Sequence, residues 1–435
     1  MQVAASDIQE FWSQRFPQLY DGKPYVPVPE DRVFAAGQPG VRLPTCDGRQ
    51  VMDKDWQGNA FYCAGGNYIA YDARPFGLIS SLSSEFGDAA VGAVLAHEWG
   101  HAVQDRAGNT RVPTIYAELQ ADCFSGAWVA HVTAGEADGV TLRPGDLDQV
   151  LAAMLTFRDS PGSKPGAMNA HGSGFDRVAA FQDGYRHGAQ ACVPYFRDPP
   201  FITEIPYANA REVRSGGNVA APRVFPASVE LLNDFYSRVS RRTYRPVSAD
   251  DVRSFDPADP PSVFPPCGEV TLSPEDLTNT VYFCRPDRYV VIDVDYMQRV
   301  YEEIGDFGVT TLLAVPWATY VQELQGVADA GGSEASSRSA DCYTGGFAAA
   351  MVLGQLRSDT MRGYVSLSPG DLDEAISAFL DADQLTGGEG DAVFSRVSAF
   401  RDGFFDGYDS CGESWPPVPS PSAPPATSPG GGQEG

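Results

Sequence analysis

The 435-residue sequence contains no apolar run long enough to span a bilayer, which takes about 20 consecutive apolar residues. Basic residues are also scarce, because 31 Lys and Arg stand against 57 Asp and Glu and give a formal net charge of −26. A chain so acidic lacks the basic surface that nucleic acid and anionic membranes require, so we expect neither as a partner. No two cysteines have the C-x₂-C spacing of a zinc knuckle, which argues against a structural zinc site.

The chain also lacks, at its start, the charged and then apolar stretch of a secretory signal, since it opens MQVAASDIQEFW. Its eight cysteines nevertheless favour an oxidising compartment. We therefore expect an extracellular or cell-surface protein whose signal or anchor is not present in this sequence. The Pro-, Ser- and Gly-rich residues 417–435 predict a disordered tail.

The most informative stretch is HEWGH, which fits the pattern H-E-x-x-H. Residues four apart on a helix share a face, so His97 and His101 can both offer a ring nitrogen to one metal ion. Glu98 then lies beside the metal, where it can accept a proton from a bound water. The apolar, helix-compatible residues 89–96 precede the motif, and Gly108 is a suitable residue just past the end of a helix. The motif is therefore expected inside a helix.

A third ligand is expected from a second helix that follows a short loop. Glu118 comes 17 residues after His101, which leaves room for a turn and an antiparallel return. A catalytic zinc site needs three protein ligands and one open position, so Glu118 would complete a His₂Glu set. Asp122, one turn further on, is expected to accept a hydrogen bond from a ligand histidine. The alternative is a surface helix that merely carries two acids.

Three blocks of sequence carry a family resemblance: AHEWGHAVQ, ELQADCFSGAW and HGSGFDRVAAFQDGYRHGAQAC. Together they resemble the neutral zinc metallopeptidases of bacteria, a family of the gluzincin type, over most of residues 40–215. The resemblance implies a zincin-like fold, zinc bound by His97, His101 and Glu118, and Glu98 as the catalytic carboxylate.

The chain also repeats itself. LRPGDLD at 142–148 recurs as LSPGDLD at 367–373, and DRVAAFQDGYRHG at 176–188 recurs as SRVSAFRDGFFDG at 395–407. The cysteines form two sets of four with nearly the same gaps, 17, 60 and 69 in the first and 17, 58 and 69 in the second. We interpret the protein as two homologous domains, 1–222 and 223–416.

Four cysteines in each half allow three connectivities. The parallel spacing favours pairing the first two and the last two of each set. The expected disulfides are Cys46–Cys63, Cys123–Cys192, Cys267–Cys284 and Cys342–Cys411.

The second copy has lost the residues of the expected zinc site. Aligning TLLAVPWATYVQ with AVLAHEWGHAVQ replaces positions 97, 98 and 101 by Val315, Pro316 and Thr319, and further along the repeat Glu118 is replaced by Ser337. Pro316 would also break or kink a helix interior. We therefore expect one zinc ion, in the first domain, and a degenerate second domain. Asp122 persists as Asp341, which suggests that it also has a role in the fold.

All five histidines lie in the first domain. His171 precedes a capping pattern at 173–176 and is a candidate to stabilise the oxyanion of a tetrahedral intermediate, its repeat counterpart being Gly390. The alternative for His171 is a surface-loop histidine. His131 and His187 are interpreted as partly exposed helix residues.

The expected fold is α+β and mostly helical, with a leading helix in each half (about 5–16 and 227–240), a β-hairpin (59–64 and 67–72) and further helices near 145–158 and 174–187. The expected function is hydrolysis of peptide bonds in a peptide or protein substrate by a zinc metallopeptidase. Two rivals remain: a non-catalytic extracellular binding or scaffold protein, and a zinc hydrolase of a non-peptide bond. The sequence gives no indication of oligomeric state.

Overall fold

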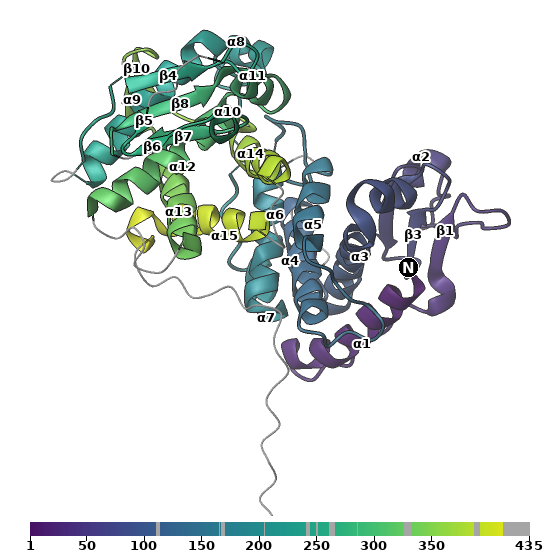
Figure 1. The fold of residues 1–435 in the computed structure, drawn as a ribbon. Helices are drawn as coiled ribbons and strands as arrows, with labels where there is room; N and C mark the ends of the chain where they lie inside the picture. Colours follow the sequence, from purple (N-terminus) through teal and green to yellow (C-terminus); the bar gives the residue numbers. More distant parts are fainter. Residues whose placement is uncertain are drawn as a thin grey trace, which may run out of the picture.

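The structure is a computed structural model that describes residues 1–109, 114–164, 166, 170–203, 205–240, 244–248, 251–260, 266–284, 286–325, 333–386 and 392–411. The expected tail 417–435 and the His171 counterpart Gly390 lie outside the described residues. The fold is mostly helical with small mixed sheets (Figure 1), which confirms the α+β class. Among the described residues, no helix is both long enough and apolar enough to cross a membrane.

The first half begins with a long helix and a small sheet, which are followed by a bundle of helices. Its elements are α1 (Gln2–Leu19), β1 (Val33–Ala36), α2 (Asp53–Trp56), β2 (Ala60–Cys63), β3 (Tyr68–Asp72), α3 (Leu78–Ala107), α4 (Thr114–Thr133), α5 (Asp146–Thr156), α6 (Gly174–His187), α7 (Ala189–Cys192) and α8 (Ala210–Ser215). The predicted hairpin and the predicted helix near 174–187 are therefore present, and the leading helix is longer than expected.

The second half has a similar order of elements, with additional short strands, with helix α11 before α12, and with no described α-helix after α15. Its elements are α9 (Ala221–Val239), β4 (Val252–Phe255), β5 (Pro266–Cys267), β6 (Val270–Thr271), α10 (Pro274–Leu277), β7 (Val281–Cys284), β8 (Tyr289–Asp293), α11 (Val294–Glu303), α12 (Asp306–Gln325), α13 (Ser333–Val352), β9 (Leu356–Ser358), β10 (Gly363–Val365), α14 (Asp371–Thr386) and α15 (Ala392–Asp406). Short 3₁₀ helices lie at Glu30–Arg32, Val193–Phe196 and Tyr408–Ser410.

The small sheets of the two halves have the same topology. β1 pairs parallel with β3, and β2 pairs antiparallel with β3, so that the strand order is β1-β3-β2. In the second half β4, β8 and β7 repeat this arrangement in the same order. In both sheets the last residue of the edge strand is a cysteine opposite a tyrosine, namely Cys63 opposite Tyr68 and Cys284 opposite Tyr289.

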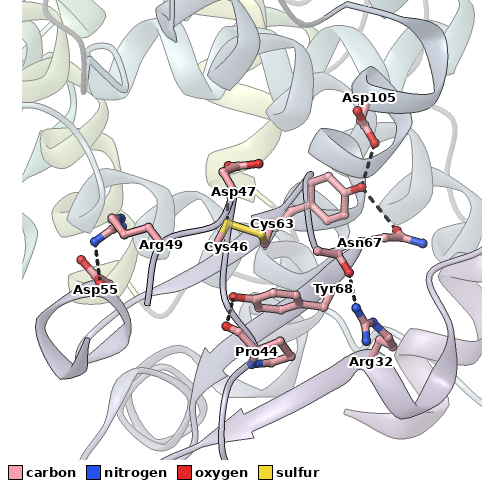
Figure 2. The surroundings of a disulfide bond; sticks show 12 residues. Arg32, Pro44, Cys46, Asp47, Arg49, Asp55, Cys63, Asn67, Tyr68 and Asp105 are labelled. Atoms are coloured by element: carbon pink, nitrogen blue, oxygen red, sulfur yellow. Dashed lines mark hydrogen bonds and ion pairs between the residues drawn. A yellow bond between two sulfur atoms is a disulfide. The ribbon is translucent and has the colours of Figure 1, made fainter. Parts of the chain in front are cut away.

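All eight cysteines are among the described residues, and they pair as expected within each half. Cys46–Cys63 ties an irregular segment to the edge strand β2 (Figure 2). On the same hairpin the Tyr68 hydroxyl donates to the Pro44 carbonyl at 3.2 Å. The hairpin therefore has a fixed position relative to the chain that precedes it.

The expected helix break at Pro316 is absent, because α12 runs through that residue. The helix carries a buried face that includes Leu313, Ala314 and Trp317 and packs between α9, α13 and α14. Burial of this face outweighs the local cost of the proline, which is about 3 kcal/mol.

The two halves meet through α5 and α6 on one side and α14 and α15 on the other (Figure 1). The Phe175 ring lies against the rings of Phe400 and Phe404, with centroids 6.1 and 5.1 Å apart. The largest hydrophobic cluster of the described residues contains side chains from both halves, so the halves do not have separate cores.

Two aspartates at equivalent repeat positions cap helices of the opposite half. Asp148 accepts the N–H groups of Val393 and Phe394 at 3.1 and 2.6 Å, at the start of α15. Asp373 accepts the N–H of Phe175 at 2.7 Å, at the start of α6. A buried carboxylate at a helix start satisfies N–H groups that the helix leaves unpaired.

We expect the whole chain to unfold in one cooperative calorimetric transition, because the shared apolar cluster and the reciprocal caps are lost when either half unfolds. Scanning calorimetry with the disulfides intact would measure this. Two well-separated transitions would contradict it and would show that the interface contributes little to stability.

Candidate metal centre

The motif residues lie on the buried face of α3, where that helix crosses α4. His97 and Glu98 are buried, and Gly108 ends α3 in the left-handed conformation with φ of 86°. Gly100, inside the motif, allows a close approach of the two helices, because a Cβ at this position would lie 2.8 Å from the Ala121 Cα. The Ser125 hydroxyl of α4 also donates to the Ala93 carbonyl of α3 at 2.7 Å.

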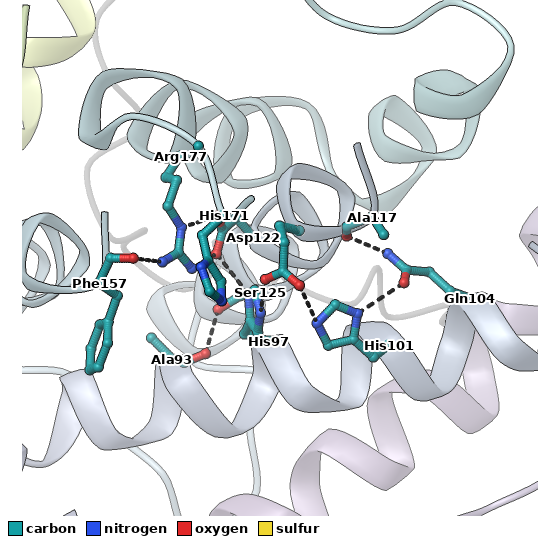
Figure 3. Close-up of polar contacts among 12 residues, drawn as sticks. Ala93, His97, His101, Gln104, Ala117, Asp122, Ser125, Phe157, His171 and Arg177 are labelled. Carbon is teal, nitrogen blue, oxygen red and sulfur yellow. Dashed lines mark hydrogen bonds and ion pairs between the residues drawn. The ribbon is translucent and has the colours of Figure 1, made fainter. Parts of the chain in front are cut away.

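This crossing brings three predicted ligands together (Figure 3). The Nε2 atom of His97 lies 3.2 Å from Glu118 Oε2, and the Nε2 atom of His101 lies 3.5 Å from Glu118 Oε1. One ligand atom of each residue lies within 4.8 Å of the others, a spacing suited to a single metal ion. Two imidazole nitrogens and one carboxylate oxygen are the donor set of a His₂Glu zinc site, so the residues present fit this metal.

Asp122 and Arg177 hold the His97 ring from behind. The Nδ1 atom of His97 lies 2.7 Å from Asp122 Oδ1. Arg177, on α6, donates to both oxygens of Asp122 at 2.8 and 2.9 Å, and to the Phe157 carbonyl at 2.9 Å. Asp122 thus takes the expected place behind a histidine, and it also forms a buried ion pair.

The sequence interpretation missed Arg177, although a signal was present. The same pair recurs in the second half, where Arg396 donates to both oxygens of Asp341 at 3.1 and 3.0 Å. The second half thus contains an Asp–Arg pair of the same geometry, although it has Val315, Thr319 and Ser337 at the positions aligned with the candidate ligands. This recurrence indicates that the Asp–Arg pair belongs to the scaffold, and in the first half it also contacts His97.

Gln104 orients the second histidine and was also missed. Its Oε1 atom lies 3.0 Å from His101 Nδ1, and its Nε2 atom donates to the Ala117 carbonyl at 2.6 Å. Because Ala117 precedes Glu118, Gln104 links the position of one candidate ligand to that of another.

The site residues perturb one another's pKa values. Burial opposes protonation of His97, but Asp122 and Glu118 outweigh it and raise its pKa to about 10. Burial raises the pKa of Glu118, but His101 and His97 hold it well below its usual value. In the metal-free protein the ligands therefore pair with each other as cation and anion, and a metal ion would replace the protons on the histidines.

Glu98 points into a cleft of about 620 Å³ next to the three ligands. Burial raises the pKa of Glu98, and the nearby His97 and His101 partly offset that rise. The edge strand β2 forms one wall of the cleft, and the backbone of Tyr62 on this strand also lowers the pKa of Glu98.

The Tyr62 side chain attaches this wall to the motif helix. Its hydroxyl donates to Asp105 at 3.0 Å and accepts from Arg106 at 2.6 Å, both on α3. The edge strand is therefore held at a fixed distance from the candidate ligands.

His171 lies at the rim of the same cleft, with half of its side chain exposed. Its backbone N–H donates to Asp159 at 2.7 Å, and its Nδ1 atom is 3.4 Å from the same carboxylate. Ser173 caps α6 as the sequence predicted.

The remaining histidines lie outside the candidate site. His131 is on α4, 3.1 Å from Glu136, and His187 is the exposed last residue of α6. Neither lines the cleft.

Residues 55–196 match a protein family described as "Putative neutral zinc metallopeptidase". The matched region contains the candidate ligands and Glu98. Zinc is the metal that this family description implies.

Two curated relatives are themselves uncharacterized proteins. YpfJ of Escherichia coli strain K12 is 29% identical over 210 residues, which cover 43% of this chain and 68% of that protein. Rv2575 of Mycobacterium tuberculosis strain H37Rv is 30% identical over 151 residues, or 29% of this chain and 52% of that protein. No solved structure matches the chain significantly.

Proposed function

We propose that this protein is a zinc-dependent metallopeptidase whose single active site lies in residues 1–222. The main support is the convergence of His97, His101 and Glu118 on one point, with Glu98 beside them in an open cleft. Three protein ligands leave a coordination position for water or substrate, as catalytic zinc sites require. The similarity of residues 55–196 to a zinc peptidase family supports the same reaction class.

Zinc bound by these residues would polarise the scissile carbonyl and lower the pKa of a coordinated water to about 7. Glu98 accepts the proton of the attacking water and returns it to the leaving amine. Asp122 fixes the orientation of His97, and Gln104 that of His101. His171, at the rim, is a candidate to donate to the developing oxyanion.

The substrate is proposed to be an extended peptide. β2 is an edge strand that lines the cleft, and such an edge offers unpaired N–H and C=O groups to a peptide that adds as a further strand. A peptide paired in this way would pass close to Glu98, because Tyr62 of the same strand and Glu98 line the same cleft.

Residues 223–416 are proposed to be a duplicated copy that lost its catalytic residues. The matching strand order, disulfide connectivity and Asp–Arg pairs of the two halves support a common origin. The disulfides fit an oxidising environment, and we propose an extracellular or cell-surface location.

The first test is metal content together with cleavage. We expect one zinc per chain by elemental analysis, because the second half has Val315, Thr319 and Ser337 at the ligand positions. Cleavage of a mixed peptide library should be lost with a chelator and restored by zinc. Two tightly bound zinc ions, or cleavage that the chelator does not affect, would contradict the proposal.

A further inference from the structure

Three acidic side chains converge in the second half, away from the candidate zinc site. Asp306 is the first residue of α12, Asp371 is the first residue of α14, and Glu374 lies one turn further along α14. One oxygen of each lies within 4.8 Å of the others. Asp306 and Asp371 are 9% and 6% exposed. Within the described part of the chain no arginine, lysine or histidine pairs with them.

Each carboxylate uses one oxygen to accept a backbone N–H. Asp306 Oδ2 accepts from Val219 at 3.1 Å. Asp371 Oδ2 accepts from Ser368 at 2.8 Å, and Glu374 Oε2 accepts from Phe307 at 2.8 Å. These bonds fix the orientation of the three groups.

The second oxygen of Asp371 lacks a matching donor. Asp371 Oδ1 is fully buried and has no hydrogen-bond partner. An unpaired buried carboxylate oxygen is costly, and three neighbouring carboxylates also repel one another. Neutralisation by protons or by a cation is therefore required.

Asn218 contributes a further polar group to the cluster. One terminal atom of its side-chain amide lies 2.9 Å from Asp306 Oδ1 and 3.2 Å from Glu374 Oε1, and when that atom is the nitrogen it donates to both carboxylates. Because the amide can turn, it can present its nitrogen to the carboxylates when no cation is bound and its oxygen when a cation lies between them. Three carboxylates and an amide oxygen form the hard, all-oxygen donor set that Ca²⁺ prefers.

The corresponding place in the first half differs in charge in an informative way. The first half reads LRPGDLDQ where the second half reads LSPGDLDE. Arg143 and Gln149 of the first half therefore correspond to Ser368 and Glu374 of the second half. In the first half Arg143 contacts Asp146 through its backbone N–H at 2.8 Å and its guanidinium at 3.4 Å. The second half has therefore lost the protein's own cation at this position and gained a carboxylate.

We propose that Asp306, Asp371, Glu374 and Asn218 bind one Ca²⁺ ion, a site separate from the candidate zinc centre. The ion joins the segment between α8 and α9 to the first turns of α12 and α14. It thereby stabilises the second half next to the junction of the two repeats, and it takes no part in hydrolysis.

The proposal is tested by calorimetric titration of the full chain with Ca²⁺. The protein is first stripped of metals and then given one equivalent of zinc. We expect one equivalent of Ca²⁺ to bind and the thermal midpoint to rise with Ca²⁺. Asp371→Asn and Glu374→Gln should each weaken Ca²⁺ binding about tenfold or more, because each removes a ligand charge. Asp146→Asn, the equivalent change in the first half, should leave Ca²⁺ binding unchanged.

A further variant, which carries the charges of the first half, distinguishes loss of Ca²⁺ ligands from misfolding. Ser368→Arg with Glu374→Gln gives the second half the residues of the first, so it should fold without Ca²⁺ and show no rise in midpoint when Ca²⁺ is added. Absence of Ca²⁺ binding at millimolar concentration in the parent would overturn the proposal. Unchanged Ca²⁺ affinity in Asp371→Asn and Glu374→Gln would overturn it as well.

Discussion

Glu98→Gln is expected to reduce peptide hydrolysis by about 10²–10⁴-fold while one zinc per chain stays bound. The side chain lies beside the candidate ligands and is not one of them, and glutamine has nearly the same shape. An amide cannot accept the proton of the attacking water at neutral pH, so the proton transfer is lost and the fold is kept.

Glu118→Ala is the control that separates loss of chemistry from loss of metal. This variant removes a candidate ligand, so its zinc content should fall and its activity should fall with it. The measurements are turnover on the best library peptide and zinc content after dialysis. Near-native turnover of Glu98→Gln would show that the proposed mechanism is wrong, and the binding-protein rival would then gain support.

Local sequence patterns predicted the elements that carry the candidate site. Histidines four apart within an apolar helical run require a shared helix face, and α3 provides it. Gly108 ends that helix in the left-handed conformation, as its position after the run predicted. The hairpin predicted at 59–64 and 67–72 is present as β2 and β3, because the aromatic and β-branched residues of these segments favour strands.

Contacts between residues distant in sequence could not be predicted in the same way. Asp148 and Asp373 resemble ordinary acidic residues in the first turn of their own helices. Their contacts with the starts of α15 and α6 depend on how the halves pack, which no local pattern encodes. Pro316 is the opposite case, because a reliable local rule was overridden by burial of the surrounding helix.

The two Asp–Arg pairs allow a matched comparison of fold and metal site. Asp122 pairs with Arg177 and also contacts His97, whereas Asp341 pairs with Arg396 and has no histidine beside it. Removing one partner of a buried ion pair costs about 3–5 kcal/mol, because the other charge is left buried and unpaired. The side chains of the first pair are 3% and 7% exposed and those of the second 1% and 26%, so the cost should be larger in the first half.

Asp122→Asn and Asp341→Asn should therefore both lower the free energy of unfolding of the metal-free protein, measured by denaturant titration. Only Asp122→Asn should also weaken zinc binding, by about 10–100-fold, because only this variant releases the ring of a ligand histidine. Competition with a chromophoric zinc chelator measures the affinity in each variant. An equal loss of zinc affinity in Asp341→Asn would mean that the effect passes through the shared core of the two halves. An unchanged affinity in Asp122→Asn would mean that His97 needs no support from this carboxylate, and the assignment of Asp122 as a positioning residue would then fail.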